Sequence, residues 1–278
     1  MYKILFVTDG LSLNSSTLDF ATYLAHLTES TITAVFLENL ANEERLIVKN
    51  THDYTFVGYE VDEHAEGYKK KMKLIESNIQ AFKNACSVRD LNYAIHRDRA
   101  TPAEEIITES RFSDIIITDP GISFEARYED SPTRFTRDIL ARAECPVIVV
   151  ASNTELQQAV FAYDGSAEAV FALKQFTYLF PQFRNKNLVI IEVKKEKTGA
   201  ESSRYQFKEW LKNHYNSVAF EIFEGDVEMQ LFGYLFTKKQ SIVIMGAYSR
   251  NRLSRMFAGS KADFLIKALT LPIFIAHP

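Results

Sequence analysis

The sequence predicts an α/β fold built on parallel, doubly wound sheets. Short apolar runs, of the length of strands buried on both faces, alternate with longer segments whose apolar residues recur at helical spacing. The same order then occurs a second time, and the first strand of each copy ends at Asp-Gly, as Asp9-Gly10 and Asp164-Gly165. We therefore expect two domains, 1–153 and 154–278, each a five-stranded parallel sheet with helices on both faces.

In the first domain the expected strands are apolar runs at 4–7, 32–37, 93–95, 115–117 and 146–150. Helices are expected between them, capped by Ser15 or Ser16 in the first case and by Thr101 before Pro102 in the third. The other two helices are expected at 68–85 and 132–142. Residues 43–66 are polar and irregular, so we expect a long loop with some helix. This loop either shapes a partner surface, covers the site, or is a disordered insertion.

The second domain repeats this order after a polar boundary at 152–157. Its expected strands are the runs at 160–163, 188–191, 220–223, 242–245 and 272–275. Helices are expected at 167–179, 205–214 and 228–237. A last helix should begin after Ser260, a plausible N-cap with Asp263 three residues on.

One motif stands between the last two strands of the second domain: Gly246-x2-Ser249-x9-Gly259-Ser260. A glycine at a strand end lets backbone approach a ligand, and a helix N-terminus attracts an anion such as phosphate. The spacing resembles the nucleotide-binding signature of the universal stress protein (UspA-like) family, G-x2-G-x9-G-[S/T]. Ser249 replaces the second glycine; a serine at positive φ costs roughly 1 kcal/mol, so we expect weakened ATP binding.

The resemblance covers the whole chain, as two fused universal stress protein domains. It implies Rossmann-like (adenine nucleotide alpha hydrolase-like) domains, a role in stress response or signalling, and ATP with Mg²⁺ as the ligand of the second domain. The residues that it implies for nucleotide binding are Asp164, Val193, Gly246, Ser249, Gly259 and Ser260. Asp164 would lie near the ribose, phosphates and metal, and the Val193 backbone would meet the adenine. The remaining residues belong to the loop that would hold ribose and phosphates.

The family's dimers imply a further feature, because the last strands of two such domains pair antiparallel. Residues 146–150 and 272–275 are therefore the expected interface of an intramolecular pseudo-dimer. Whether the fused chain forms a further homodimer stays open.

The first domain departs from the motif at two positions. Asp119 stands where Gly246 would be, and Ser131-Pro132 falls at the position of Gly259. A carboxylate repels phosphate and proline lacks a backbone donor, so we expect no ATP binding there. A structural alternative exists for Asp164 in the second domain, since Asp-Gly-Ser also favours a turn followed by a helix cap.

Composition excludes several other classes of function. The net charge of −4 argues against bulk nucleic-acid binding, and no apolar run approaches the length of a membrane span. With no signal-peptide pattern at the N-terminus, a cytoplasmic protein is the expectation. The two cysteines and six histidines show no metal-ligand spacing.

Two alternatives to the nucleotide-binding stress protein remain. One is a protein-interaction module of the same fold that binds no nucleotide, which Ser249 and the altered first domain favour. The other is an ATP-using enzyme, but the sequence shows no nucleophile elbow and no general base held by a partner. We expect at most slow ATP hydrolysis.

Overall fold

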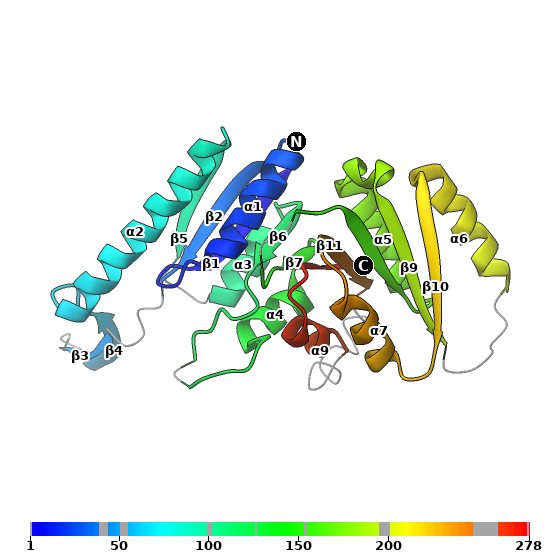
Figure 1. Cartoon of the computed structure of the whole chain (residues 1–278). Coiled ribbons are helices and arrows are strands. Elements are labelled where there is room, and N and C mark those ends of the chain that lie inside the picture. Colours follow the sequence, from blue (N-terminus) through cyan, green and yellow to red (C-terminus); the bar gives the residue numbers. More distant parts are fainter. Residues whose placement is uncertain are drawn as a thin grey trace.

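The structure is a computed structural model that describes residues 2–38, 44–50, 55–98, 102–125, 127–152, 155–194, 201–246, 261–276 and 278. For residues 44–50, 55–60, 194, 201–204 and 261–262 it describes the backbone only. Strands and helices alternate along the chain, as the apolar runs predicted (Figure 1).

The first half contains β1 (Lys3–Asp9), α1 (Ser15–Leu27), β2 (Thr31–Leu37), β3 (Glu44–Asn50), β4 (Thr55–Val61), α2 (Glu66–Val88), β5 (Tyr93–Asp98), α3 (Pro102–Ser110), β6 (Ile115–Thr118), α4 (Arg134–Arg142) and β7 (Val147–Val149). The second half contains β8 (Gln158–Tyr163), α5 (Ala167–Leu179), the 3₁₀ helix η2 (Pro181–Asn185), β9 (Asn187–Lys194), α6 (Glu201–His214), β10 (Ser217–Glu224), α7 (Val227–Phe236), β11 (Ser241–Gly246), α9 (Lys261–Ala268) and β12 (Ile273–Ala276).

Ten of these strands form one sheet in the order β10-β9-β8-β11-β12-β7-β6-β1-β2-β5. From the middle outward, the first half has the order β7, β6, β1, β2, β5 and the second half has β12, β11, β8, β9, β10. Both halves thus place their strands in the same order, which is the doubly wound arrangement. Within each half, all strand pairs of this sheet are parallel. The predicted α/β fold class is confirmed.

The two halves meet through their last strands, which pair antiparallel with Ile148 opposite Phe274. The expected pairing of 146–150 with 272–275 is therefore confirmed. The predicted domain boundary between Asn153 and Thr154 lies outside the described residues.

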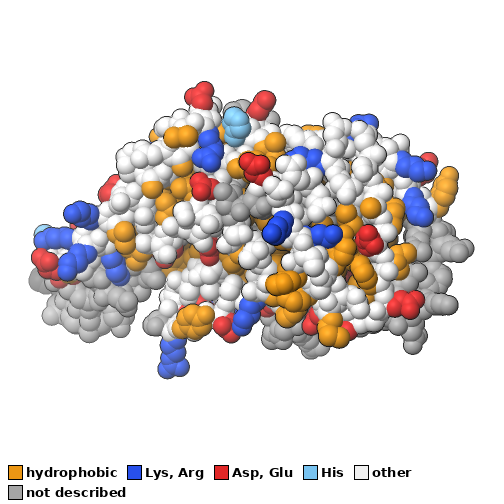
Figure 2. All heavy atoms as spheres, viewed as in Figure 1, with side chains coloured by type: hydrophobic (Ala, Val, Ile, Leu, Met, Phe, Trp, Pro, Cys, Tyr) orange, Lys and Arg blue, Asp and Glu red, His pale blue; other side chains and the backbone are white. Residues whose placement is uncertain are grey.

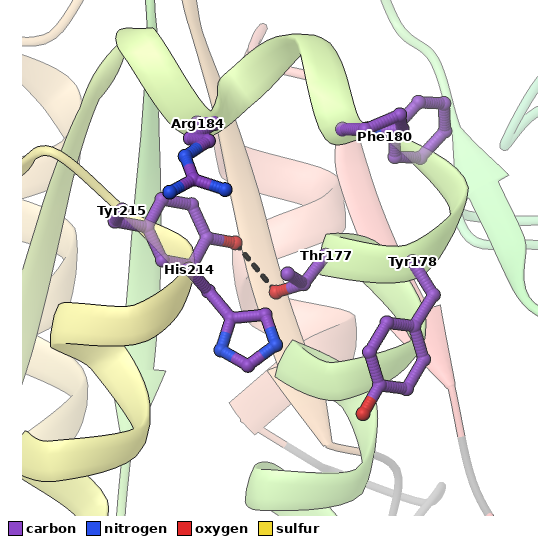
Figure 3. Close-up of a pocket in the computed structure, with 7 residues that line it drawn as sticks. Thr177, Tyr178, Phe180, Arg184, His214 and Tyr215 are labelled. Carbon is purple, nitrogen blue, oxygen red and sulfur yellow. Dashed lines mark hydrogen bonds between the residues drawn. The ribbon is translucent and has the colours of Figure 1, made fainter.

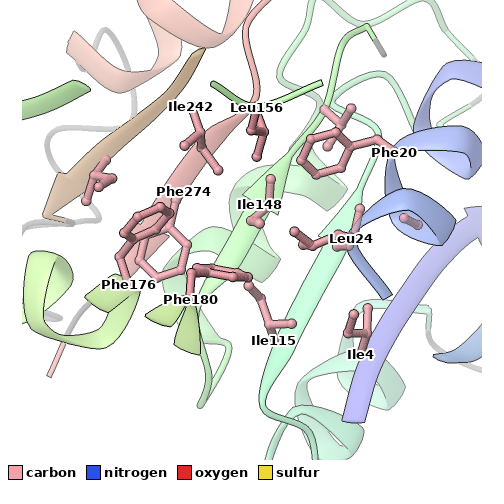
Figure 4. Packing of buried hydrophobic residues seen from close by; sticks show 14 of the residues in the cluster. Ile4, Phe20, Leu24, Ile115, Ile148, Leu156, Phe176, Phe180, Ile242 and Phe274 are labelled. Carbon is pink, nitrogen blue, oxygen red and sulfur yellow. The ribbon is translucent and has the colours of Figure 1, made fainter. Parts of the chain in front are cut away.

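Two layers of helices cover the sheet, because alternate strand residues point to opposite faces. Ile4 and Phe6 belong to a buried cluster that includes residues of α1, α2, α5 and α6, whereas Leu5 and Val7 belong to a second cluster with residues of α3, α4, α7 and α9. The first of these clusters runs across the junction between the halves without a break. Figure 4 shows this junction, where Phe180 and Phe176 lie against Phe274 and next to Ile148.

The prediction for residues 43–66 is wrong. β3 and β4 form a separate two-stranded antiparallel sheet next to the start of α2 (Figure 1). Both segments are rich in β-branched, aromatic and other apolar residues, a strand signal that flanking charges such as Arg45 and Glu60 made less visible.

Two predicted helix starts also need correction. Asn14, and not Ser15 or Ser16, caps α1: its side-chain oxygen accepts from the N–H groups of Ser16 and Thr17. Thr133 caps α4, which begins two residues later than the predicted 132. The predicted cap Thr101 lies outside the described residues.

Candidate functional site

In doubly wound sheets ligands bind beyond the carboxyl ends of the strands, where the strand order reverses. That point lies between β1 and β6 in the first half and between β8 and β11 in the second. The strand registers show that these places correspond. Ile148 and Phe274 face each other where the halves meet, so Val149 and Ile275, the next residues of the two strands, are equivalent. Thr118 pairs with Val149, and Met245 pairs with Ile275. Asp119 and Gly246, which follow Thr118 and Met245, therefore occupy equivalent positions.

In the second half Asp164 follows β8 and is exposed. Its Oδ1 accepts a hydrogen bond of 2.9 Å from the N–H of Ser166. Gly165 between them has φ +83°, a conformation that favours glycine. Ser166 then caps α5, its hydroxyl accepting from the N–H of Ala169 at 3.1 Å. The turn-and-cap role considered for this segment is therefore present, and Asp164 still faces solvent.

Gly246 ends β11 against the first turn of α5. A Cβ at this position would lie 2.5 Å from the backbone N of Ala169 and 2.7 Å from the carbonyl carbon of Glu168. Only glycine lets the strand and the helix approach so closely. The structure thus gives Gly246 a packing role, whereas its predicted contact with a ligand stays a prediction.

Val193, at the end of β9, is half-buried and packs on the α7 and α9 side of the sheet. The structure places it at the same edge as Asp164 and Gly246, because all three end neighbouring parallel strands. Ser249, Gly259 and Ser260 lie outside the described residues. The described part of the predicted site is therefore a strand edge beside the start of α5.

In the first half the equivalent place is filled by the side chain of Asp119. Its Oδ1 accepts from the N–H of Gly121 at 2.6 Å. Its Oδ2 accepts from the side-chain amide of Asn14 and lies 3.5 Å from the hydroxyl of Thr17. The same hydroxyl has a single proton, and the carbonyl oxygen of Val150 lies closer to it, at 3.2 Å. A carboxylate thus lies beside the first turn of α1, where it accepts from the side chain of the capping residue Asn14.

Burial raises the pKa values of two carboxyl groups at this edge. It raises the pKa of the Asp119 carboxyl above its ordinary value, although hydrogen bonds from Gly121, Asn14 and Thr17 act in the opposite direction. Burial also raises the pKa of Asp9, against the N–H of Leu11 and the charge of Lys71. The first-half edge therefore carries two carboxylates that are costly to ionise.

An ion pair between a buried carboxylate and a partly exposed arginine lies further along the same edge. Glu38, whose side chain is fully buried, accepts from Nε of Arg97 at 2.5 Å. Nη1 of Arg97 reaches Glu76 of α2 at 2.6 Å. Sequence reasoning missed this pair and the Asn14–Thr17–Asp119 cluster, because their members are far apart in the chain. The only local signal was Asn14, a favoured N-cap directly before a helical pattern.

The described residues do not group into a cluster of three or more His, Cys, Asp or Glu side chains that could hold a metal ion. Among the described helices, none combines the length and apolar character that crossing a membrane requires.

No protein-family model and no curated protein sequence matches the chain. Solved structures do. A universal stress protein from Archaeoglobus fulgidus superposes with a TM-score of 0.69 at 16% identity, over 99% of this chain and 98% of that one. A provisionally assigned universal stress protein from Pseudomonas aeruginosa gives 0.57 at 12% identity, over 99% and 92%. A protein of unknown function from the same species gives 0.58 at 13%, over 100% and 92%. Over its full length, the chain shares the fold of these proteins.

Proposed function

We propose that the chain is a universal stress protein-like module of stress response or signalling, which binds one adenine nucleotide with Mg²⁺ at the carboxyl edge of its second half. Two features support this. The full-length fold is that of the solved universal stress proteins. Of the two equivalent strand ends, Asp119 and Gly246, only Gly246 carries no side chain. It begins the motif, which continues in the sequence with Ser249, Gly259 and Ser260.

The contrast between Asp119 and Gly246 carries the proposal. In the first half a carboxylate already accepts from the side-chain amide of Asn14 and from the N–H of Gly121, so a phosphate there would meet negative charge. In the second half the equivalent position has no side chain, and Asp164 is exposed beside the start of α5. These differences favour the second half over the first as the place of a nucleotide. Mg²⁺ would offset the phosphate charge near Asp164.

Thermal unfolding with increasing Mg²⁺–ATP tests the proposal. At a tenfold excess over the dissociation constant, ligand binding adds roughly 1.4 kcal/mol to the free energy of unfolding. Asp164→Asn should reduce the shift, whereas Asp9→Asn, the equivalent change in the first half, should leave it intact. Absence of any shift at millimolar ATP, or equal loss in both variants, contradicts the proposal.

A second candidate is an interaction module of the same fold that binds no nucleotide. The packing of Gly246 on α5 favours it, because that contact explains the glycine without a ligand. Ser249→Gly separates the two candidates by restoring the second glycine of the motif. If the native chain binds no ATP and the variant does, serine at this position has removed the activity and the interaction module is the better description.

A further inference from the structure

The opposite edge of the second half holds a cavity of about 290 Å³. It lies where α5 and α6 end and η2 crosses between them, so it faces away from Asp164 and Gly246 (Figure 3). Six of the residues that line it are Thr177, Tyr178, Phe180, Arg184, His214 and Tyr215. The volume is near the lower end of small-molecule sites and fits about one substituted ring.

The lining of this cavity offers positive charge without a balancing acid. Its residues include Arg184 and His214 and no aspartate or glutamate. Arg97, Arg137 and Arg142 each contact a carboxylate, but Arg184 has no carboxylate within ion-pair distance in the described part of the chain. A guanidinium presents a planar fork of donors that matches a carboxylate.

The imidazole of His214 is held in a defined orientation. Its Nδ1 lies 2.8 Å from the carbonyl oxygen of Trp210, which can only accept, so Nδ1 carries the proton. The ring also stacks on Trp210, with centroids 4.1 Å apart and planes 21° apart. The other ring nitrogen points toward Thr177 and Tyr178, on the cavity side (Figure 3).

The wall between Arg184 and His214 is polar but neutral. Thr177 and Tyr215 share a hydrogen bond of 2.6 Å between their hydroxyls (Figure 3). Burial raises the pKa of Tyr215 to about 12, so its phenol stays uncharged. Tyr178 leaves 52% of its surface exposed at the mouth, which offers a ring face to a flat ligand.

From these contacts we propose that the cavity is a second ligand site, specific for a small aromatic carboxylate. Arg184 binds the carboxylate, His214 supplies a second polar contact, and Tyr178 packs against the ring of the ligand. The site is separate from the proposed nucleotide site, since it lies at the amino ends of the strands.

Trp210 provides the measurement, because it is the only tryptophan in the sequence and stacks on His214. We expect benzoate to change tryptophan emission in a saturable way, and calorimetry to give the same dissociation constant. Benzyl alcohol, which keeps the ring and lacks the charge, should bind about tenfold more weakly or worse.

Arg184→Gln should weaken benzoate binding about tenfold or more, because it removes the charged partner. The matched control is Arg134→Gln, an exposed arginine of the first half whose side chain is 75% accessible; it should leave binding unchanged. Native affinity for benzoate in Arg184→Gln overturns the proposal, as does the absence of binding by both methods at millimolar benzoate. Inorganic phosphate that binds as tightly as benzoate overturns the assignment of an aromatic carboxylate.

Discussion

The carboxyl edges of the two half-sheets differ at one equivalent pair of positions, Asp119 and Gly246. In both halves this position lies against the first turn of the helix that follows the first strand. In the first half, the side chain of Asp119 reaches the capping residue Asn14 and Thr17. In the second, the strand itself approaches the helix, and no side chain fits. The same contact between strand and helix is thus made once by a carboxylate and once by backbone.

This difference shows how two copies of one fold can lose equivalence without a change in topology. The strand order is the same in both halves. What changed is the group that faces the helix start, which is a carboxylate side chain in the first half and the strand backbone in the second. The first-turn N–H groups are capped in both halves, by Asn14 in α1 and by Ser166 in α5. Substitutions at these positions test the comparison most directly.

The largest expected effect is that of Gly246→Ala. Its Cβ would stand 2.5 Å from the backbone N of Ala169, and a backbone atom cannot move aside as a flexible side chain can. We expect the free energy of unfolding, measured in urea, to fall by about 3 kcal/mol.

The matched control is Gly233→Ala. Gly233 lies inside α7, and a Cβ added to it meets nothing within 4 Å. This change should be neutral or should stabilise by up to about 1 kcal/mol, because alanine favours helix. Equal stabilities of the two variants would show that Gly246 does not hold the strand against α5.

A smaller loss is expected for Asp119→Ala. The change leaves the amide of Asn14 and the N–H of Gly121 without their acceptor, which should cost about 2 kcal/mol in chemical denaturation. Asp19→Ala serves as the control: that carboxylate is exposed, lies 3.9 Å from Arg89, and should matter by less than about 0.5 kcal/mol. Similar losses in both variants would remove the distinction between the two edges.

The stability lost in Asp119→Ala should also depend on pH, with a sign that follows from the pKa of Asp119. Since the pKa of Asp119 is raised in the folded chain, the folded state holds this proton more tightly than the unfolded state. Its stabilising effect is therefore fully present below the unfolded pKa and is lost as pH rises through the folded value. The stability difference between native and Asp119→Ala should thus be larger in mild acid than at neutral pH; the opposite trend would contradict the assigned cause.

The smallest effect concerns the junction of the halves, where Arg137 of α4 donates to Asp263 of α9 at 3.1 Å. Arg137 and Asp263 are separated in the sequence by the same number of residues as Ile148 and Phe274, which face each other where the halves meet. Arg137 and Asp263 therefore occupy equivalent positions in the two halves. In a symmetric dimer such positions near the axis would carry identical residues and repel. Fusion has allowed an ion pair to form.

A double-mutant cycle measures that pair. Arg137→Asp should destabilise by about 1 kcal/mol, and adding Asp263→Arg should recover most of the loss. The control is the second pair across the junction, Lys267 with Asp130 at 2.8 Å, where both side chains are more than half exposed. Its coupling should be weaker, because solvent screens both charges. Coupling that is equal in the two pairs would mean that the partial burial of Asp263 adds nothing.

Sequence by itself determined the class of fold, the duplication and the succession along the chain of the ten strands of the main sheet. These depend on local properties: apolar runs of strand length, helical spacing, and the Asp-Gly that ends β1 and β8. It also pointed to Asp119 as the equivalent of Gly246, which the strand registers support. Periodicity reports burial, and burial is what specifies a doubly wound sheet.

Only the tertiary structure decided what these positions contact. That Asp119 meets Asn14 and Thr17, or that Arg184 and His214 line one cavity, depends on segments brought together by packing. The separate sheet of β3 and β4 was likewise missed, because charges interrupt its apolar residues. Hydrogen bonds between residues distant in the chain leave no periodic trace, so no reading of local pattern could have found them.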